Sequence, residues 1–316
     1  MPPSAKIVIP DDAPAVLARS PAYGRLIEVA SVAYYGNLPG SEAELAARIA
    51  EAEVVLNIRA SSRFTELVLA QAPRLRLISI WGTGTDNVDL PAAARCGVTV
   101  TNTPGVAAPS IAEHALALAL AVARRLPRLD AETRRGAWPR GDILLLNRKT
   151  LGIIGLGAIG QRFAGMGAGI GMRVIAWTMH PKPDLGFEIV ELEELLRSAD
   201  VVSLHLRLSD QTRGFLGRRE LALMKPSAIL LNTARGAIVD ESALVEALAA
   251  RRIAGAGLDV FETEPLPANH PLCALDNVVL TPHSAGIAPE VLEAGLQLAV
   301  DNIVEFLCGR RQNVVR

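Results

Sequence analysis

The chain contains two series in which short runs of β-branched or aliphatic residues alternate with segments whose apolar residues recur every three or four positions. The runs are typical of strands and the segments between them of helices. In the first hundred residues we expect strands at 6–9, 54–59, 75–81 and 98–103, and a weaker strand near 28–35. Helices are expected at 41–52, 63–71 and 90–95. The first begins with a capping box, in which the Ser41 hydroxyl and the Glu44 carboxylate accept from free backbone N–H groups. Strands that alternate with helices indicate a parallel sheet covered on both faces.

A second series of the same kind begins near residue 150. It predicts strands at 151–154, 173–178, 201–206, 229–232, 253–260 and 278–281, with helices at 217–223 and 241–251. The last helix, predicted at 289–307, follows the completed second sheet and is free to return to the first domain. The predicted fold class is therefore α/β, with two doubly wound parallel-sheet domains.

An almost wholly apolar helix is predicted at 109–126, where two arginines and Pro127 end it. A helix that is apolar on every face is buried on every face, so we expect it between layers, between domains or in a subunit interface. The next stretch, 128–148, has little periodicity and carries Trp138. We interpret it as an arm that packs on another subunit, with a plain surface loop as the alternative. The expected assembly is a homodimer formed through residues 109–148.

Composition and charge exclude several classes of binding partner for this chain. A chain of 316 residues suits two domains, and its formal net charge of −1 lacks the basic excess that nucleic-acid binding needs. The three cysteines are widely spaced and form no metal-binding or redox motif, which is typical of thiols in a reducing compartment. The N-terminus has no signal-peptide pattern, and no apolar run is long enough to span a membrane. We expect a cytoplasmic protein without a nucleic-acid or membrane partner.

The stretch 151–178 is the most informative about a ligand. A short apolar strand leads into Gly155-Leu156-Gly157-Ala158-Ile159-Gly160, and a helix and a second strand follow at the distance of a βαβ unit. In such a turn the first glycine makes the bend, the second admits a pyrophosphate to the backbone, and the third lets helix and strand pack closely. Glycine turns also occur for structural reasons alone, but the second strand favours a dinucleotide site. The unpaired N–H groups at the helix N-terminus, around Ala158 and Ile159, would bind the pyrophosphate.

Three later loops carry polar residues where strands are expected to end: 232–236 (NTARG), 258–266 (LDVFETEPL) and 281–286 (TPHSAG). Ligands of open α/β sheets bind at the carboxyl ends of the strands. Together with the glycine turn, NTPG at 102–105 and AEHALAL at 112–118, these motifs resemble the D-isomer-specific 2-hydroxyacid dehydrogenase family, in particular its phosphoglycerate dehydrogenase-like branch. The resemblance keeps order and spacing over roughly residues 54–316.

The resemblance implies an arrangement of the two domains. A Rossmann dinucleotide-binding domain at 104–284 would be inserted in a flavodoxin-like substrate domain formed by 1–103 and 285–316. Because the chain stops at Arg316, we expect the short form of the family, without the regulatory domain of longer phosphoglycerate dehydrogenases.

The resemblance also implies three catalytic residues, Arg235, Glu264 and His283. A guanidinium can bind the carboxylate of a 2-oxo acid with two hydrogen bonds and polarise the adjacent carbonyl, which is the role expected of Arg235. Reduction leaves an alkoxide that must be protonated, and histidine can change charge near neutral pH, so His283 is the expected acid. Glu264 would bind the other ring nitrogen, fix the tautomer and favour the imidazolium.

Further cofactor contacts implied by the resemblance involve residues in the later loops. Asp259 is expected near the nicotinamide carboxamide and the Thr233–Ala234 backbone beside the ring, while His205 would lie next to the cofactor. Gly286 completes the predicted cofactor set. His114, on the apolar helix, is expected to be a core residue with satisfied hydrogen bonds, and His270 is expected to be a loop residue; neither is assigned a chemical role.

The substrate-binding loops of the family correspond to residues 57–61 and 81–86. Backbone N–H groups of the second loop could hold a carboxylate. The residues singled out are Arg59, Trp81, Gly82 and Thr83. For Arg59 the alternative is a solvated surface side chain, and Trp81 would limit the size of the substrate.

One position departs from the usual NAD-binding unit. An acidic residue normally ends the second strand and binds the ribose 2′-hydroxyl, but Thr178 stands there. No charge at Thr178 repels a 2′-phosphate, and His180, Lys182 or Arg207 could attract one. The cofactor is therefore NAD or NADP, with a slight lean to NAD from the habit of the family.

The predicted function is hydride transfer between NAD(P) and a small D-2-hydroxy acid or its 2-oxo acid, of the hydroxypyruvate, glyoxylate or 3-phosphoglycerate type. The alternative is a dinucleotide-sensing binding protein that resembles the C-terminal-binding protein corepressors. A peptide-binding cleft in the first domain and slow turnover of every 2-oxo acid would favour this alternative.

Overall fold

The computed structural model describes residues 5–141, 143–181 and 186–315, and the chain forms two compact units. The first consists of Met1–Ala107 and Ile287–Arg316, and the second of Ala108–Gly286. The functional roles of the two domains, and the boundaries expected for them, remain predictions.

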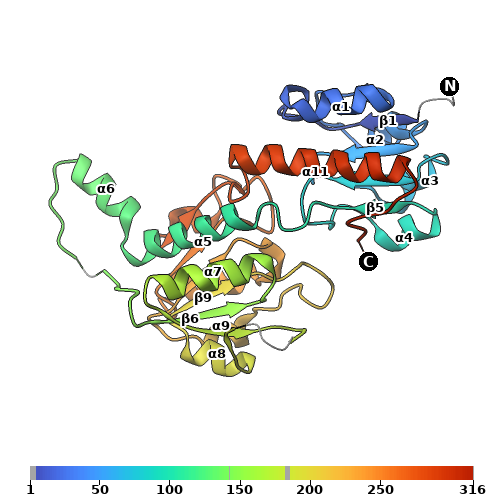
Figure 1. Cartoon of the computed structure of the whole chain (residues 1–316). Coiled ribbons are helices and arrows are strands. Elements are labelled where there is room, and N and C mark those ends of the chain that lie inside the picture. The colour runs from blue at the N-terminus through green and yellow to red at the C-terminus, as the bar shows by residue number, and fades with distance from the viewer. Residues whose placement is uncertain (1–4, 142, 182–185, 316) are drawn as a thin grey trace. The chain divides into compact units, whose positions relative to one another are not determined.

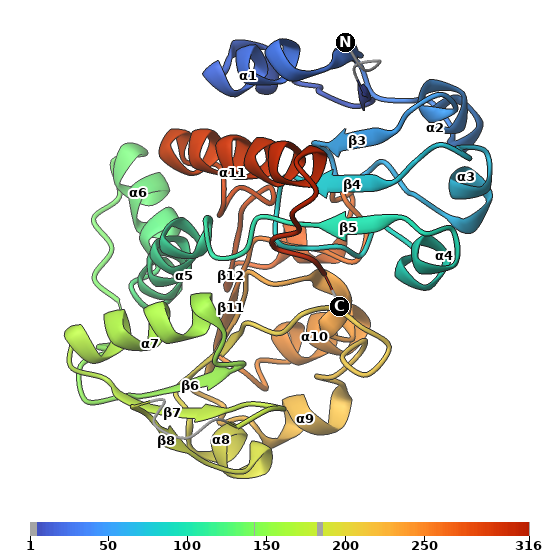
Figure 2. The ribbon, with the colours of Figure 1, turned by 45° about the vertical axis from the view of Figure 1, so that its right-hand side comes forward.

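The first unit is built on five parallel strands in the order β2-β1-β3-β4-β5, with the first crossover reversing direction at β1. This is the flavodoxin-like order, and it confirms the predicted doubly wound sheet. The strands are β1 (Lys6–Ile9), β2 (Ser31–Tyr34), β3 (Val54–Asn57), β4 (Leu77–Ile80) and β5 (Thr99–Thr101). Figure 2 shows β3, β4 and β5 side by side.

Helices cover both faces of this sheet. One apolar core lies beneath α2 (Glu42–Ile49), α3 (Glu66–Ala70) and α4 (Leu90–Arg95), and the other beneath α1 (Pro21–Val29) and α11 (Pro289–Leu307). Leu296, Ala299, Val300 and Ile303 of α11 are all buried in the second core. The last helix of the chain, red in Figure 1, therefore completes the core of the first unit.

The second unit has seven parallel strands in the order β12-β11-β10-β9-β6-β7-β8, which is the Rossmann order with an additional edge strand. The strands are β6 (Thr150–Ile154), β7 (Arg173–Trp177), β8 (Glu188–Ile189), β9 (Val201–Leu204), β10 (Ile229–Asn232), β11 (Gly255–Leu258) and β12 (Val278–Leu280). The order reverses between β6 and β9, so the carboxyl ends of these two strands flank the expected ligand crevice.

Two helices, α5 (Ala108–Ala123) and α7 (Ala158–Gly169), pack on one face of the second sheet. The opposite face is covered by α8 (Leu192–Ser198), α9 (Arg218–Leu223) and α10 (Glu241–Ala249). Short 3₁₀ turns complete the structure: η1 (Leu17–Arg19), η2 (Gly236–Ile238) and η3 (Pro271–Ala274). Asp240 caps α10 by accepting from Ala243 N at 3.0 Å.

Several predicted elements need correction. The segment near 28–35 contains a strand only at Ser31–Tyr34, because α1 occupies Pro21–Val29, where Ser20 caps it and Pro21 opens it. The capping box at Ser41 is also incomplete, since Glu44 accepts from Gly40 N at 2.7 Å instead of from Ser41 N. The short elements β8 and α8 had no clear signal in the sequence.

The apolar helix α5 is not buried on every face within one chain. Ala112, Ala115 and Leu118 are buried, but Ala117 is exposed and Leu120 is only half-buried. The arm expected after α5 begins with a helix that was not predicted, α6 (Leu126–Arg134), and none of its nine residues is buried. Among the described residues, no helix combines the length and apolar character needed to cross a bilayer.

Candidate active site

The glycine turn between β6 and α7 has the conformation that a dinucleotide site needs. Gly155 has φ +101°, and an added Cβ would lie 2.7 Å from the carbonyl oxygen of His205. A Cβ at Gly160 would overlap the Gly155 carbonyl oxygen, whereas Gly157 faces open space. Within the described part of the chain, no side chain caps α7. The turn therefore leaves room and free N–H groups at a helix N-terminus, which fits a pyrophosphate.

The end of β7 carries no carboxylate. Thr178 follows the strand directly and is half-buried, and its hydroxyl lies 3.4 Å from the N–H of His180. His180 and Arg207 are exposed, and Lys182 lies outside the described residues. The residue directly after β7 thus offers a neutral hydroxyl, where the usual NAD-binding unit has a carboxylate.

His205 lies at the end of β9, beside the glycine turn. Its Nε2 pairs with Ser203 Oγ at 2.9 Å, and its ring is 5.7 Å from that of Phe163 on α7. Burial lowers the pKa of His205 to about 3, so this ring is neutral at physiological pH. A neutral imidazole can shape the cofactor site but cannot donate the proton for a carbonyl reduction.

The loop that carries Arg235 is held by both neighbouring strands. Asn232, buried at the end of β10, accepts from Ala234 N at 3.0 Å and donates to the Arg235 carbonyl at 2.9 Å. Gly236 lies against the backbone of Phe261, where an added Cβ would overlap. Only glycine fits there, and the close approach brings the Arg235 loop beside the loop of Glu264. Thr233 is 6% exposed, and its hydroxyl has no hydrogen-bond partner among the described residues.

Asp259 organises the loop of His283. Its buried carboxylate accepts from Thr281 Oγ1 at 2.6 Å and from Ser284 N and Ala285 N, each at 2.9 Å. The Asp259 carbonyl accepts from His283 N at 2.8 Å. Both carboxylate oxygens of Asp259 therefore accept hydrogen bonds from the loop that follows β12. Whether Asp259 also contacts a carboxamide, as the resemblance implies, stays a prediction.

His283 and Glu264 form a hydrogen-bonded pair, with 2.7 Å between Nδ1 and Oε2. The other oxygen of Glu264 accepts from Phe261 N at 3.0 Å, so both ends of the carboxylate are fixed. His283 has φ +52°, a left-handed conformation that is uncommon for a residue with a side chain and that its loop contacts maintain. The pair leaves Nε2 as the ring nitrogen available to a substrate, and His283 is 44% exposed.

The charge of Glu264 is stabilised. Burial raises its pKa, but the hydrogen bonds from His283 and Phe261 and the charges of His283 and Arg235 outweigh burial, so that the pKa is lowered overall. A carboxylate that stays ionised beside an imidazole favours the imidazolium form. The charges of Arg235 and His283 both act on Glu264, so the site brings together a guanidinium, a carboxylate and an imidazole, groups that can bind an anion and exchange a proton.

The other histidines are hydrogen-bonded. His114 Nε2 on α5 lies 2.9 Å from Thr281 Oγ1 and 3.5 Å from the Asp259 carboxylate. His270 lies 3.1 Å from Glu241. The predicted structural interpretation of these two residues agrees with these contacts.

In the first unit, the residues predicted to bind substrate share one group of loops. The Arg59 guanidinium donates to the Pro14 carbonyl and lies 5.8 Å from the centre of the Trp81 ring, while its Nε is buried and has no partner within the described ranges. Trp81 packs against Gly295 of α11. Gly82 N donates to Thr103 Oγ1 at 2.9 Å, and the carbonyl of the exposed Thr83 accepts from Asn102 Nδ2 at 2.8 Å.

Sequence reasoning missed the residues that support these loops. Asn232 and Asp11 are buried and Thr281 is half-buried, and each of these polar residues holds a loop that carries a predicted site residue. Their only signal in the sequence is a polar residue at, or just after, the end of an apolar strand.

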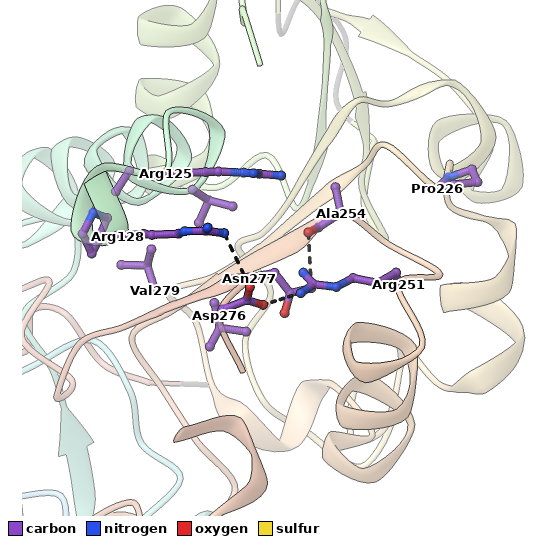
Figure 3. A pocket seen from close by; sticks show the side chains of 12 residues that line it. Arg125, Arg128, Pro226, Arg251, Ala254, Asp276, Asn277 and Val279 are labelled. Carbon is purple, nitrogen blue, oxygen red and sulfur yellow. Dashed lines mark hydrogen bonds and ion pairs between the residues drawn. The ribbon is translucent and has the colours of Figure 1, made fainter. Parts of the chain in front are cut away.

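A cavity of about 320 Å³ lies elsewhere in the second unit, between α5, the start of α6 and β12. Figure 3 shows Arg128 and Arg251 directed toward Asp276 at its wall. None of the predicted catalytic or cofactor residues lines this cavity.

Comparisons with known proteins identify the family of this chain. Residues 116–285 match the family described as D-isomer specific 2-hydroxyacid dehydrogenase, NAD binding domain. A glyoxylate reductase from Aeropyrum pernix is 47% identical over 256 residues, which cover 77% of this chain and 76% of the relative. A D-3-phosphoglycerate dehydrogenase from Methanocaldococcus jannaschii is 40% identical over 280 residues, which cover 86% of this chain and 53% of the relative.

Among solved structures, an acyclic imino acid reductase in complex with NADPH and D-Arg has a TM-score of 0.92 and 30% identity, with 98% of this chain and 100% of that chain covered. The two sheet orders, the fixed His283–Glu264 pair and these similarities lead to one assignment. The chain is an oxidoreductase that belongs to the D-isomer specific 2-hydroxyacid dehydrogenase family.

Proposed function

We propose that the enzyme reduces a small 2-oxo acid of the glyoxylate or hydroxypyruvate type to the D-2-hydroxy acid, and that Arg235, Glu264 and His283 carry the chemistry. The observation that supports this most directly is the 2.7 Å pair of His283 and Glu264 in a loop fixed by Asp259. The curated relatives include a glyoxylate reductase and a D-3-phosphoglycerate dehydrogenase, which supports a small 2-oxo or 2-hydroxy acid. The corepressor-like alternative gains no support from these comparisons.

The proposed roles follow from the geometry of each side chain. Arg235 binds the substrate carboxylate with its planar guanidinium and polarises the neighbouring carbonyl. When bound, the nicotinamide ring supplies the hydride. His283 donates a proton from Nε2 to the oxygen that becomes the hydroxyl, and Glu264 stabilises the imidazolium through Nδ1. In the oxidation direction His283 accepts the proton.

The residues proposed to hold the cofactor are those of the glycine turn and the loop after β10. Gly157 admits the pyrophosphate, and the N–H groups of Ala158 and Ile159 bind it. The Thr233 hydroxyl, buried without a partner within the described ranges, supplies a further hydrogen bond. In the first unit, Arg59 and the loop beside Trp81 are proposed to bind the substrate carboxylate.

We also propose that NAD and NADP are both accepted. Thr178 offers a hydroxyl that can bind either a ribose 2′-hydroxyl or a 2′-phosphate, and it brings no negative charge. The lean to NAD rests on the habit of the family alone. The NADPH-bound imino acid reductase supports the use of NADP in this fold.

A homodimer is proposed on the basis of the exposed apolar arm. Leu126, Trp138 and Leu145 are 52%, 78% and 64% exposed, and α5 beside them keeps apolar residues half-buried. Apolar surface of this extent in a monomer is typical of a protein–protein interface.

We further propose that the protein works in a reducing compartment such as the cytoplasm, since all three cysteines are exposed free thiols.

The substitution His283→Asn tests the catalytic assignment. We expect the turnover number with glyoxylate or hydroxypyruvate to fall by about 10² to 10⁴, because general acid catalysis is lost. The affinity for NADH or NADPH, measured by fluorescence titration, should stay within about twofold, because the ring lies in a loop apart from the glycine turn. Full activity of the variant would refute the proton-donor role.

A panel of 2-oxo acids, assayed on the wild-type protein with NADH and with NADPH, identifies the substrate. A wild-type protein that reduces none of these acids would refute the proposed reaction, and with it the proton-donor role.

The substitution Glu264→Gln tests the pH dependence. The lowered pKa of Glu264 keeps its carboxylate charged even within its ordinary titration range, so a negative charge stays beside the His283 ring, 2.7 Å from Nδ1. Loss of this charge should move the alkaline limb of the reduction profile, and the acidic limb of the oxidation profile, to lower pH by about 1 unit, because the pair is partly exposed. Limbs that stay in place, or that move upward, would contradict the proposed charge coupling.

The substitution Thr178→Asp tests cofactor choice. A carboxylate there should lower kcat/KM for NADPH by about 10- to 100-fold relative to NADH, because it repels the 2′-phosphate and accepts from the 2′-hydroxyl. The control is Thr178→Ser, which keeps the hydroxyl and should keep the ratio of the two cofactors. An unchanged ratio in the aspartate variant would show that the ribose lies elsewhere.

The double substitution Trp138→Glu with Leu145→Glu tests the dimer. Charges in the apolar arm should convert the dimer to a monomer in analytical ultracentrifugation, because burying them in an interface is unfavourable. The matched control is Leu67→Glu on α3, an exposed leucine outside the arm that should leave the assembly intact. Dissociation by the control, or a dimer that survives the double substitution, would argue against the arm as the interface.

A further inference from the structure

Two adjacent aspartates, Asp11 and Asp12, are completely buried just after β1. Carboxylates are rarely buried in full unless several donors satisfy them, because removing a charge from water is costly. Both are satisfied here, but by different parts of the first unit. Asp12 accepts from donors in its own turn, whereas Asp11 accepts from donors far along the chain.

Asp12 serves its own segment. Its carboxylate accepts from Val16 N at 2.8 Å, Leu17 N at 3.0 Å and Ala18 N at 3.2 Å, and also from the Tyr34 hydroxyl at 3.0 Å. Three of these donors lie four to six residues downstream, at the start of η1. Asp12 therefore stabilises the turn after β1 and its contact with β2.

Asp11 serves a loop far along the chain. It accepts from Asn57 Nδ2 at 2.6 Å, Ile58 N at 2.9 Å and Arg59 N at 3.2 Å. Asn57 ends β3, and Ile58 and Arg59 begin the loop that follows it, so all three donors lie in the segment 57–61, one of the two segments proposed to bind the substrate carboxylate. This carboxylate thus fixes the backbone from which the Arg59 side chain projects.

The network continues to the second substrate loop. Asn57 Oδ1 accepts from Asn87 Nδ2 at 2.9 Å, and Asn87 Nδ2 also lies 2.9 Å from the Ser62 carbonyl. The Asn57 carbonyl accepts from Trp81 N at 2.9 Å. Asp11, Asn57 and Asn87 are all buried, so that one chain of polar contacts joins the loop after β3 to both ends of the segment 81–87.

The ionised form of Asp11 is not favoured by folding. Burial raises the pKa of this carboxyl, and the hydrogen bonds from Asn57, Ile58 and Arg59 only partly oppose the effect. With a folded pKa above the unfolded one, the contribution of Asp11 to stability is largest at low pH and is lost as the pH rises through the folded pKa. A neutral side chain at position 11 would therefore give a larger free energy of unfolding at neutral pH. The Asp11 carboxylate instead accepts from three donors and so fixes the conformation of the loop after β3.

We propose that Asp11 is a positioning residue for substrate binding, whose carboxylate fixes the loop of Arg59 directly and the loop of Trp81 through Asn57 and Asn87. This inference rests on the proposed role of these loops in binding the substrate carboxylate. Misplacing a binding group by about 1 Å can cost as much as 10²-fold in rate, so that a buried residue with no substrate contact can control the reaction.

The test compares Asp11→Asn with Asp12→Asn in the full-length protein. An amide at position 11 keeps only one of the two acceptor oxygens, so in either orientation it turns its NH₂ group toward Ile58 N or toward Arg59 N, and that N–H loses its acceptor. We expect the KM for glyoxylate and hydroxypyruvate to rise by about tenfold or more, while the Kd of NADPH or NADH changes less than about twofold. In Asp12→Asn the melting temperature should fall, with the KM of these acids unchanged.

Amide hydrogen exchange gives a readout that does not depend on activity. Ile58 and Arg59 should lose protection in Asp11→Asn and keep it in Asp12→Asn, since only Asp11 accepts from these N–H groups. If the first variant does not fold, Asn87→Ala breaks the next link of the network and should raise the same KM by a smaller factor.

The two proposals fail in different ways. A wild-type protein that reduces no 2-oxo acid overturns the proposed substrate, and the exchange data then decide whether Asp11 holds the loop. An unchanged KM in Asp11→Asn with an active wild-type protein overturns the positioning role alone, and so does an equal rise in Asp12→Asn.

Discussion

The buried carboxylate of Asp259 is the group on which the conformation of the His283 loop depends. A tight loop after a parallel strand leaves several N–H groups without partners, and Asp259 accepts from two of them and from the Thr281 hydroxyl. Only with these contacts can His283 stay in a left-handed conformation and meet Glu264. The pair of His283 and Glu264, which we propose to handle the proton, thus depends on the hydrogen bonds that Asp259 makes with the backbone beneath it.

The same arrangement recurs in the first unit, where Asp11 satisfies the loop of Arg59. In each unit a buried aspartate at the carboxyl end of a strand fixes a neighbouring loop, and the residue proposed to meet the substrate projects from that loop. Because strands of a parallel sheet end at one edge, a single carboxylate can reach loops that are far apart in sequence. Rigid support at the sheet edge allows exposed side chains to be placed accurately.

The two parallel sheets and the glycine turn could be predicted from the sequence. Alternating apolar runs predicted both parallel sheets, because a strand buried on both faces must be apolar along its whole length. The glycine turn was recognisable since close backbone approaches at Gly155 and Gly160 exclude any side chain. Asp11 and Asn232 were not found, because their roles depend on donors brought close only by the folded sheet. The helix α6 was missed as well, since it buries no residue and so shows no apolar period.

The position of α11 has a consequence for biosynthesis. Its buried residues fill the core of the first unit, and the Ala299 carbonyl accepts from Ser79 in β4. The ribosome releases the strands of the first unit early and α11 only after the whole second unit has emerged. The second unit can therefore fold during translation as a continuous segment, while one apolar face of the first sheet stays partly uncovered until α11 has been synthesised.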